Sequence, residues 1–495
     1  MKNFLLFTIC LCLSLPLLAQ ESFDEYRQRM HQDFLRLKEK RTTEFENYRR
    51  KVNLEFSKYL AKRWEAMQAI KGEMPDMKPK PKNPPVVYKK PQHMDPIEAP
   101  VAGFISIPEE PENPPIRIPE LTDLQPEPDD LIVGDYFSFF VLGTQCTVSW
   151  SDDMKFQMSG NSEAEVSRVF ELLSQSQYEY LLYDCARFVS DLRLNGWGIQ
   201  MFCSSVAETL LGKGDEAVVL QTFLMTQFGY DARICLVGGK LKMMSPATVD
   251  VAAYSYITLN GKKYYIWDSS FRAGQSVYSY KENVKDATRA IDFENSASIK
   301  FEYIPTENRI VKSEKYPQMS VSVSVNKNLI DFYASMPLLL NDSWAMYARE
   351  PMEQEVDRSL LEQLTLALQG HSKTEATDML LNFVQTGFEY KTDGDQFGKE
   401  KPFFKEEMFF YPYCDCEDRS FLYSYLVEKL VGLKTILVYA PDHVFVAVCF
   451  NDDVEGDFLM VDGKKYVICD PTYIGSDIGM CMPNYKNAHL EVLKM

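Results

Sequence analysis

The chain has 495 residues, 45% of them hydrophobic and 25% charged, so it can bury two or three ordinary cores and is more than one small binding module. Its 53 basic residues are outnumbered by 71 acidic ones, which gives a formal net charge of −18 at pH 7. That charge repels nucleic-acid phosphates and anionic lipid, and it argues against a nucleic-acid-binding role.

The first residues have the pattern of an export signal. Lys2 precedes an apolar run over residues 4–18, and the small residue Ala19 follows it. The run is too short for a stable membrane span, so residues 1–19 are expected to be a secretory signal peptide, with an uncleaved anchor as the alternative. The protein is expected to be periplasmic, on the cell surface or secreted. Removing Cys10 and Cys12 leaves an odd number of cysteines, which predicts at least one free thiol.

Residues 21–70 predict one long helix. Aromatic residues recur about every 11 positions, and 11 residues make about three helical turns, so the rings fall on one stripe. One set of these rings is Phe23, Phe34, Phe45 and Phe56. Residues 20–72 are therefore expected to form an amphipathic stalk that buries the stripe on this chain, on a second copy or on a partner. A helix lying on a membrane is less well supported, because acids and bases are mixed over its polar face.

Most of the 26 prolines lie within residues 75–128. Proline fixes φ and lacks an N–H donor, so residues 73–130 are expected to form no sheet and to act as an extended linker. Such segments can also be ligands for other domains.

The rest of the chain contains an internal duplication. The sequence GKKYYIWD at residues 261–268 recurs as GKKYVICD at 463–470, and residues 163–168 are echoed by 353–358. A helix ending at Gly229 is likewise echoed by one ending at Gly432. Because the three matches keep the same order, residues 131–300 and 301–495 are predicted to be two copies of one α+β domain, each with helices leading into a small antiparallel sheet.

Three residues of the second copy have the types and order of a catalytic triad. Cys416 directly precedes a predicted helix over residues 417–431, whose N-terminal partial charge and free N–H groups favour a thiolate. His443 opens a predicted strand, and Asp470 closes another before Pro471. Neighbouring antiparallel strands can place His443 beside Asp470, which supplies a nucleophile, a base and an orienting acid. Taken singly, each residue also fits a core, loop or turn position.

This order of residues resembles the bacterial transglutaminase-like superfamily, which has the papain-like cysteine-nucleophile fold, over about residues 376–483. The resemblance implies acyl transfer at an amide: Cys416 attacks a carbonyl, His443 exchanges protons and Asp470 holds the imidazole. Water as acceptor gives a peptidase or amidase, and an amine gives a cross-linking enzyme. The sequence departs from the family pattern at two places. Cys414 stands where the family often has Gly, which leaves open a second thiol near the site. No Trp follows His443, which leaves the substrate specificity open.

An oxyanion hole requires donors aimed at the developing charge. The backbone N–H of Cys416 is the first candidate, and Gln396, Tyr411 and Tyr413 are candidates for the second. No cofactor is expected. No metal is expected either, because the C-x-C of residues 414–416 with His443 lacks a second cysteine pair at zinc-site spacing.

The first copy has lost the triad. Lys213 aligns with Cys416, and no histidine lies between His93 and His371, whereas Asp268 is retained. This copy is expected to be catalytically inactive and structural. Its cysteines, for which core and disulfide roles both remain open, are Cys185, Cys203 and Cys235.

The sequence thus predicts two tandem transglutaminase-like, papain-like α+β domains, the first degenerate and the second carrying Cys416, His443 and Asp470, behind a long helix and a proline-rich linker. The expected function is that of an exported cysteine enzyme acting on peptide or glutamine-type amide bonds of a protein or peptide substrate. The alternative is a non-catalytic binding or scaffold protein with the same fold.

Overall fold

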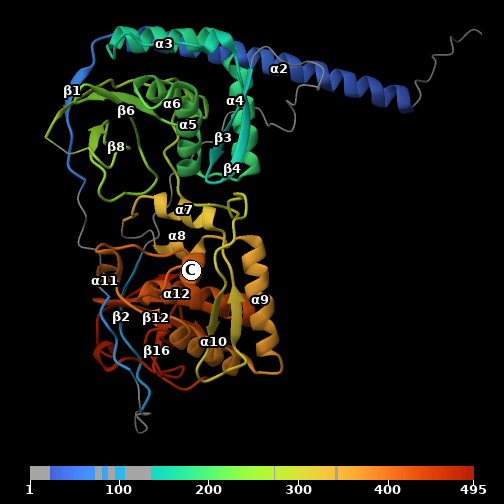
Figure 1. Ribbon diagram of the computed structural model, residues 1–495. Coiled ribbons are helices and arrows are strands. Elements are labelled where there is room, and N and C mark those ends of the chain that lie inside the picture. The colour runs from blue at the N-terminus through green and yellow to red at the C-terminus, as the bar shows by residue number, and fades with distance from the viewer. Residues whose placement is uncertain are drawn as a thin grey trace, which may run out of the picture.

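The computed structural model describes residues 23–72, 81–86, 95–105, 135–271, 274–340 and 344–494. The predicted signal peptide and much of the proline-rich segment lie outside these residues. The described chain is a mixed α+β structure with two six-stranded sheets, and the second sheet, formed mostly from the C-terminal half, also takes in β2 from residues 101–104 (Figure 1).

The first half contains a helical layer and an antiparallel sheet. Its strands follow the order β1-β9-β5-β6-β8-β7, and a hairpin of β3 and β4 packs beside the helices. The bounds are α2 Phe23–Leu60, β1 Glu65–Gln68, β3 Asp135–Val141, β4 Thr144–Trp150, α3 Glu163–Gln175, α4 Tyr178–Asp191, α5 Gly196–Leu211, α6 Asp215–Gln227, β5 Arg233–Val237, β6 Lys240–Ser245, β7 Tyr256–Leu259, β8 Lys262–Ile266 and β9 Ser276–Ser279.

The second half repeats this plan. Its sheet has the order β16-β17-β15-β14-β18-β2. The bounds are β2 Val101–Phe104, β10 Arg309–Lys312, β11 Ser320–Val323, α7 Lys327–Ser335, α8 Trp344–Arg349, α9 Gln354–Leu368, α10 Lys373–Gly387, β12 Glu389–Tyr390, α11 Asp393–Phe397, β13 Tyr413–Cys414, α12 Cys416–Leu426, β14 Lys434–Ala440, β15 His443–Cys449, β16 Phe458–Val461, β17 Lys464–Cys469 and β18 Leu490–Lys494. Short 3₁₀ turns occupy Asp152–Met154, Lys405–Phe409 and Pro483–Tyr485, and a π-helical turn occupies Val427–Val431.

The internal repeat is visible in the sheets as well as in the sequence. In the first sheet β5, the strand that follows α6, lies between β6 and β9. In the second sheet β14, the strand that follows α12, lies between β15 and β18. The registers agree too: Val237 pairs with Lys240 in the first sheet, and Ala440 pairs with His443 in the second. His443 therefore occupies the position that Lys240 has in the first copy.

Helix α2 ends earlier than residue 70, the limit expected from the sequence. The indole of Trp64 donates to the carbonyl of Leu60 at 3.2 Å and caps the last turn, after which β1 pairs with β9. The C-terminal part of the helix packs on α3, where the rings of Phe56 and Phe170 are 5.5 Å apart. Its N-terminal part extends beyond the rest of the described chain (Figure 1).

The prediction that residues 73–130 form no sheet was wrong at β2. Val101–Phe104 pairs in parallel with β18 at the edge of the second sheet, and Glu98 bridges to Phe458. Ala99 is buried against an apolar cluster that includes Ile436 and Val438. An edge position tolerates the flanking prolines because one side of the strand needs no ladder bonds.

Candidate active site

The buried pair of His443 and Asp470 forms the centre of the candidate site. His443 is the first residue of β15, and Asp470 directly follows β17, which pairs with β15. The Nε2 atom of His443 lies 2.9 Å from Oδ2 of Asp470. Both side chains are at most 3% exposed. This contact leaves Nδ1 as the imidazole nitrogen for proton exchange with another group.

The Asp470 carboxylate is held by the turn that follows it. Its Oδ1 accepts hydrogen bonds from the backbone N–H groups of Thr472 and Tyr473, at 2.9 and 3.2 Å. The buried amide of Gln385, on α10, donates to the carbonyls of Asp470 and Tyr473, both at 3.0 Å. Gln385 is therefore a positioning residue that the sequence analysis missed.

Cys416 begins helix α12, as the sequence predicts, and the helix lies against β15. The side chain of Ser420, one turn along the helix, donates to the carbonyl of Val444 at 3.2 Å. The backbone N–H of the same Val444 faces the Cys416 sulfur. Val444 directly follows His443, so these contacts hold the start of α12 against the start of β15.

The expected thiolate character of Cys416 was wrong. Complete burial, followed by the nearby carboxyls of Glu417 and Asp415, raises the pKa of the thiol well above its ordinary value. The sulfur donates to Oε2 of Glu417 at 3.2 Å, and no hydrogen bond joins it to His443 in the described structure. The helix N-terminus favours a thiolate, but desolvation and two adjacent acids outweigh it.

Two tyrosines, Tyr485 and Tyr390, have pKa values that respond to Cys416. The ring of Tyr485 stacks on the His443 ring, with centroids 5.2 Å apart. Burial, a hydrogen bond to Asp442 and the proximity of Cys416 all raise the pKa of Tyr485. Burial and Cys416 likewise raise the pKa of Tyr390. Both aromatic residues were missed because their positions follow from long-range packing.

The three side chains proposed for the oxyanion hole are placed elsewhere. Gln396 lies on α11 and is partly exposed. Tyr411 stacks on Phe403, with ring centroids 4.9 Å apart. Tyr413 lies on β13 under the ammonium of Lys391, which is 5.1 Å from its ring centroid. None of the three makes a hydrogen bond to Cys416 in the described structure.

Arg419 ties the start of α12 to the elements around it. Its buried guanidinium donates to the carbonyls of Gln385, Phe388 and Pro471, at 3.1, 2.6 and 3.4 Å. Its Nε also contacts the sulfur of Cys414 at 3.4 Å. Cys414 is thus a buried free thiol in contact with Arg419. The described cysteines form no disulfide, and Cys185, Cys203 and Cys235 are buried core residues.

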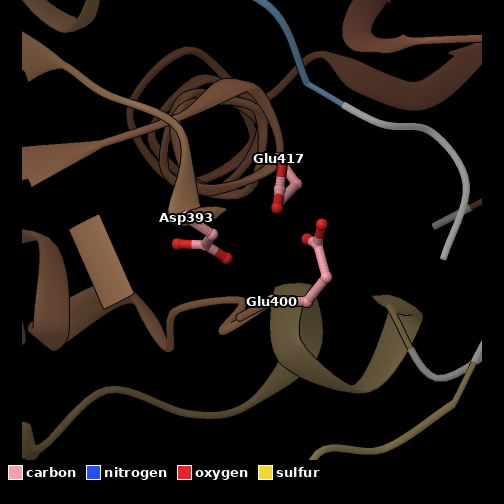
Figure 2. A group of neighbouring side chains, drawn as sticks. All are labelled: Asp393, Glu400 and Glu417. Carbon is pink, nitrogen blue, oxygen red and sulfur yellow. The ribbon is translucent and has the colours of Figure 1, made fainter. Parts of the chain in front are cut away.

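A cluster of carboxyl groups lies beside the nucleophile position (Figure 2). Asp393, Glu400 and Glu417 have ligand atoms within 4.8 Å of one another, and Figure 2 shows the three side chains converging. Burial raises the pKa of Asp393 to about 10, helped by the nearby Asp415 and Asp418.

This carboxyl cluster could hold a divalent cation. The Oε1 atom of Glu417 is buried and has no hydrogen-bond partner. Two oxygens on opposite sides of a Ca²⁺ ion are about 4.6–5.2 Å apart, so the spacing suits such an ion. The spacing of cysteine and histidine in the sequence predicts no metal site. The repeated acids of residues 393–418 were the available signal.

The first copy carries a different pair at the corresponding place. Lys213, which aligns with Cys416, is exposed, and its Nζ atom lies 3.8 Å from Oε2 of Glu208. Asp268 pairs with Lys242 at 2.7 Å instead of with a histidine. The first sheet is thus retained without a nucleophile or a base.

Comparison with known proteins gives no matching family model, no matching curated protein and no matching solved structure. Within the described residues, no helix combines the length and the apolar character needed to cross a bilayer.

Proposed function

We propose that this chain is an exported cysteine enzyme that transfers acyl groups at peptide or glutamine-type amide bonds. Cys416 is the nucleophile, His443 the general base and Asp470 the orienting acid. The observation that carries the proposal is the buried 2.9 Å contact between His443 and Asp470, on a strand packed against the helix that Cys416 begins.

The proposed reaction has two half-steps. In the first, Nδ1 of His443 takes the thiol proton while the Cys416 sulfur bonds to the substrate carbonyl carbon. The C–N bond then breaks, the proton passes to the leaving nitrogen, and a thioester remains on the sulfur. In the second half-step, water or an amine gives its proton to His443 and attacks the thioester, which frees the thiol. Asp470 keeps the imidazole aligned in both steps.

The test is a comparison of products from a library of peptides and glutamine donors. The wild-type protein should produce new carboxyl termini or new isopeptide bonds, detected by mass spectrometry. Cys416→Ala should abolish them, and Cys449→Ala, a matched change on the half-buried thiol of β15, should retain them. Products that persist in Cys416→Ala would exclude Cys416 as the nucleophile.

A non-catalytic binding or scaffold role is the second candidate. It is favoured by the sulfur's hydrogen bond to Glu417 instead of to His443, and by the first copy, which keeps the sheet without the triad. A scaffold leaves the library unchanged even with the wild-type protein, under conditions in which the protein is folded.

The proposal includes export and a role for helix α2 in self-association or in docking a partner. Export predicts that the mature protein starts near residue 20, which N-terminal sequencing of the protein recovered outside the cytoplasm would test. Sedimentation of the protein with and without residues 20–45 would test association through the part of α2 that extends beyond the body.

A further inference from the structure

A short proline-rich segment, residues 81–86, contacts both sides of the candidate site. The ammonium group of Lys82 lies 2.7 Å from Oδ2 of Asp442. The backbone carbonyl of the same Lys82 accepts a hydrogen bond from the hydroxyl of Tyr390 at 3.0 Å. We call residues 81–86 the strap.

The two anchors of the strap lie beside different members of the triad. Tyr390, on β12, pairs in the sheet with Cys414, two residues before Cys416. Asp442 directly precedes His443. It also accepts a hydrogen bond from Tyr485 at 2.9 Å, the tyrosine whose ring stacks on His443. Lys82 therefore links the segment before the nucleophile to the residue before the base.

The composition of the strap favours an extended peptide. Pro81, Pro84 and Pro85 each fix φ near the value of a polyproline helix, and the segment has no regular secondary structure. Its contacts have the form that a bound peptide would make: one backbone carbonyl meets a hydroxyl donor, and one cationic side chain meets a carboxylate.

The sulfur of Cys416 and the imidazole of His443 are closed to solvent. Cys416 is 0% exposed and His443 is 2% exposed, so no amide can reach the sulfur in this arrangement. The Lys82 side chain itself is 73% exposed, and an ion pair with that much solvent contact is weak. The strap is therefore held loosely enough to be displaced.

We propose that the strap lies where an extended peptide substrate binds, blocks access to Cys416 until it is displaced, and marks the substrate as a peptide with a lysine or arginine bound by Asp442. This inference rests on the proposed function for its substrate, although the blocking contact itself does not need catalysis.

The first test measures how fast iodoacetamide alkylates Cys416, by mass spectrometry of the peptide that contains it. Lys82→Ala should raise this rate by about fivefold, the factor that corresponds to loss of one exposed ion pair. Lys82→Arg should stay near the wild-type rate. Asn83→Ala, a truncation of the next exposed side chain, is the matched control. Equal rates in the wild type and Lys82→Ala would overturn the blocking role.

The second test uses a synthetic peptide with the sequence of residues 81–86. Added to the Lys82→Ala protein, it should slow alkylation of Cys416, and the same peptide with glutamate in place of lysine should not. Equal protection by the two peptides would overturn the selection by Asp442. If the strap variants react faster but no variant acts on any library peptide, the strap stands and the proposed enzyme activity fails.

Discussion

The imidazole of His443 and the carboxylate of Asp470 lie 2.9 Å apart in the interior of the second copy, although they are 27 positions apart in the chain. The contact exists because β15 and β17 are antiparallel neighbours, so that the start of β15 and the end of β17 lie at the same edge of the sheet. Replacing either partner alone leaves the other buried without its hydrogen bond, so the pair is costly to break.

Asp470→Asn tests the pair as an orienting device. An amide cannot stabilise an imidazolium as a carboxylate does, so kcat/KM on any substrate found in the library should fall by about 10²–10⁴-fold. Asp462→Asn, at the exposed turn between β16 and β17, is the control and should keep full activity. If kcat/KM is unchanged in Asp470→Asn, Asp470 does not assist His443 as the general base.

Arg419→Lys tests whether the guanidinium positions the site. A lysine ammonium cannot replace the fork that reaches three backbone carbonyls, so carbonyls at the ends of two elements lose their donors. The free energy of unfolding in urea should fall by about 2–4 kcal/mol. Arg358→Lys, on the exposed face of α9, should change it by less than about 0.5 kcal/mol. A neutral Arg419→Lys change would show that these contacts do not hold the fold.

The free energy of unfolding should depend on pH through the buried carboxyl group of Glu350. Burial raises its pKa from the ordinary 4.5 to about 8, and its Oε1 accepts from Asn295 at 2.7 Å. Between these two pH values the folded protein holds a proton that the unfolded chain has lost, so stability is full below about 4.5 and falls as the pH rises to about 8. Burial raises the pKa of Glu406 to about 7, so Glu406 also makes the protein less stable as the pH rises. Burial lowers the pKa of Lys405 to about 8, so stability depends on pH through Lys405 only above about pH 8.

The measurement is urea unfolding of the wild type and Glu350→Gln at pH 5 and pH 8. The wild type should lose on the order of 3 kcal/mol more than Glu350→Gln over this range, because the amide does not titrate. Glu355→Gln, exposed on α9, should follow the wild type. Parallel pH profiles for the wild type and Glu350→Gln would contradict the assignment.

Divalent cations should stabilise the folded chain through the carboxyl cluster. A ligand that binds only the folded state at 100 times its Kd adds about 2.7 kcal/mol, so CaCl₂ should raise the midpoint of thermal unfolding by about 5 °C. Glu417→Gln removes the negative charge and one of the two carboxylate oxygens and should abolish the rise, whereas Asp395→Asn, exposed on α11, should not. The absence of any shift with CaCl₂ or MgCl₂ in the wild type would contradict a cation site.

The local features of the site could be predicted from the sequence. Apolar periodicity marks the helix that begins at Cys416, and Gly432, with φ of 66°, ends its π-helical extension where a left-handed residue is needed. Alternating strands place His443 and Asp470 at strand ends. The repeated GKKY segments indicate a second copy. These signals depend on residues that are close together in the chain, so they can be recognised from the sequence alone.

Tertiary structure alone decided the state of the thiol and what lies around it. Complete burial of Cys416 is the largest cause of its raised pKa and outweighs the effect of the helix N-terminus on the thiol. The insertion of β2 beside β18 contradicts what the proline content of the segment predicts. Desolvation, edge pairing and the convergence of carboxyl groups depend on segments that are distant in the chain, and no local pattern encodes the distances between them.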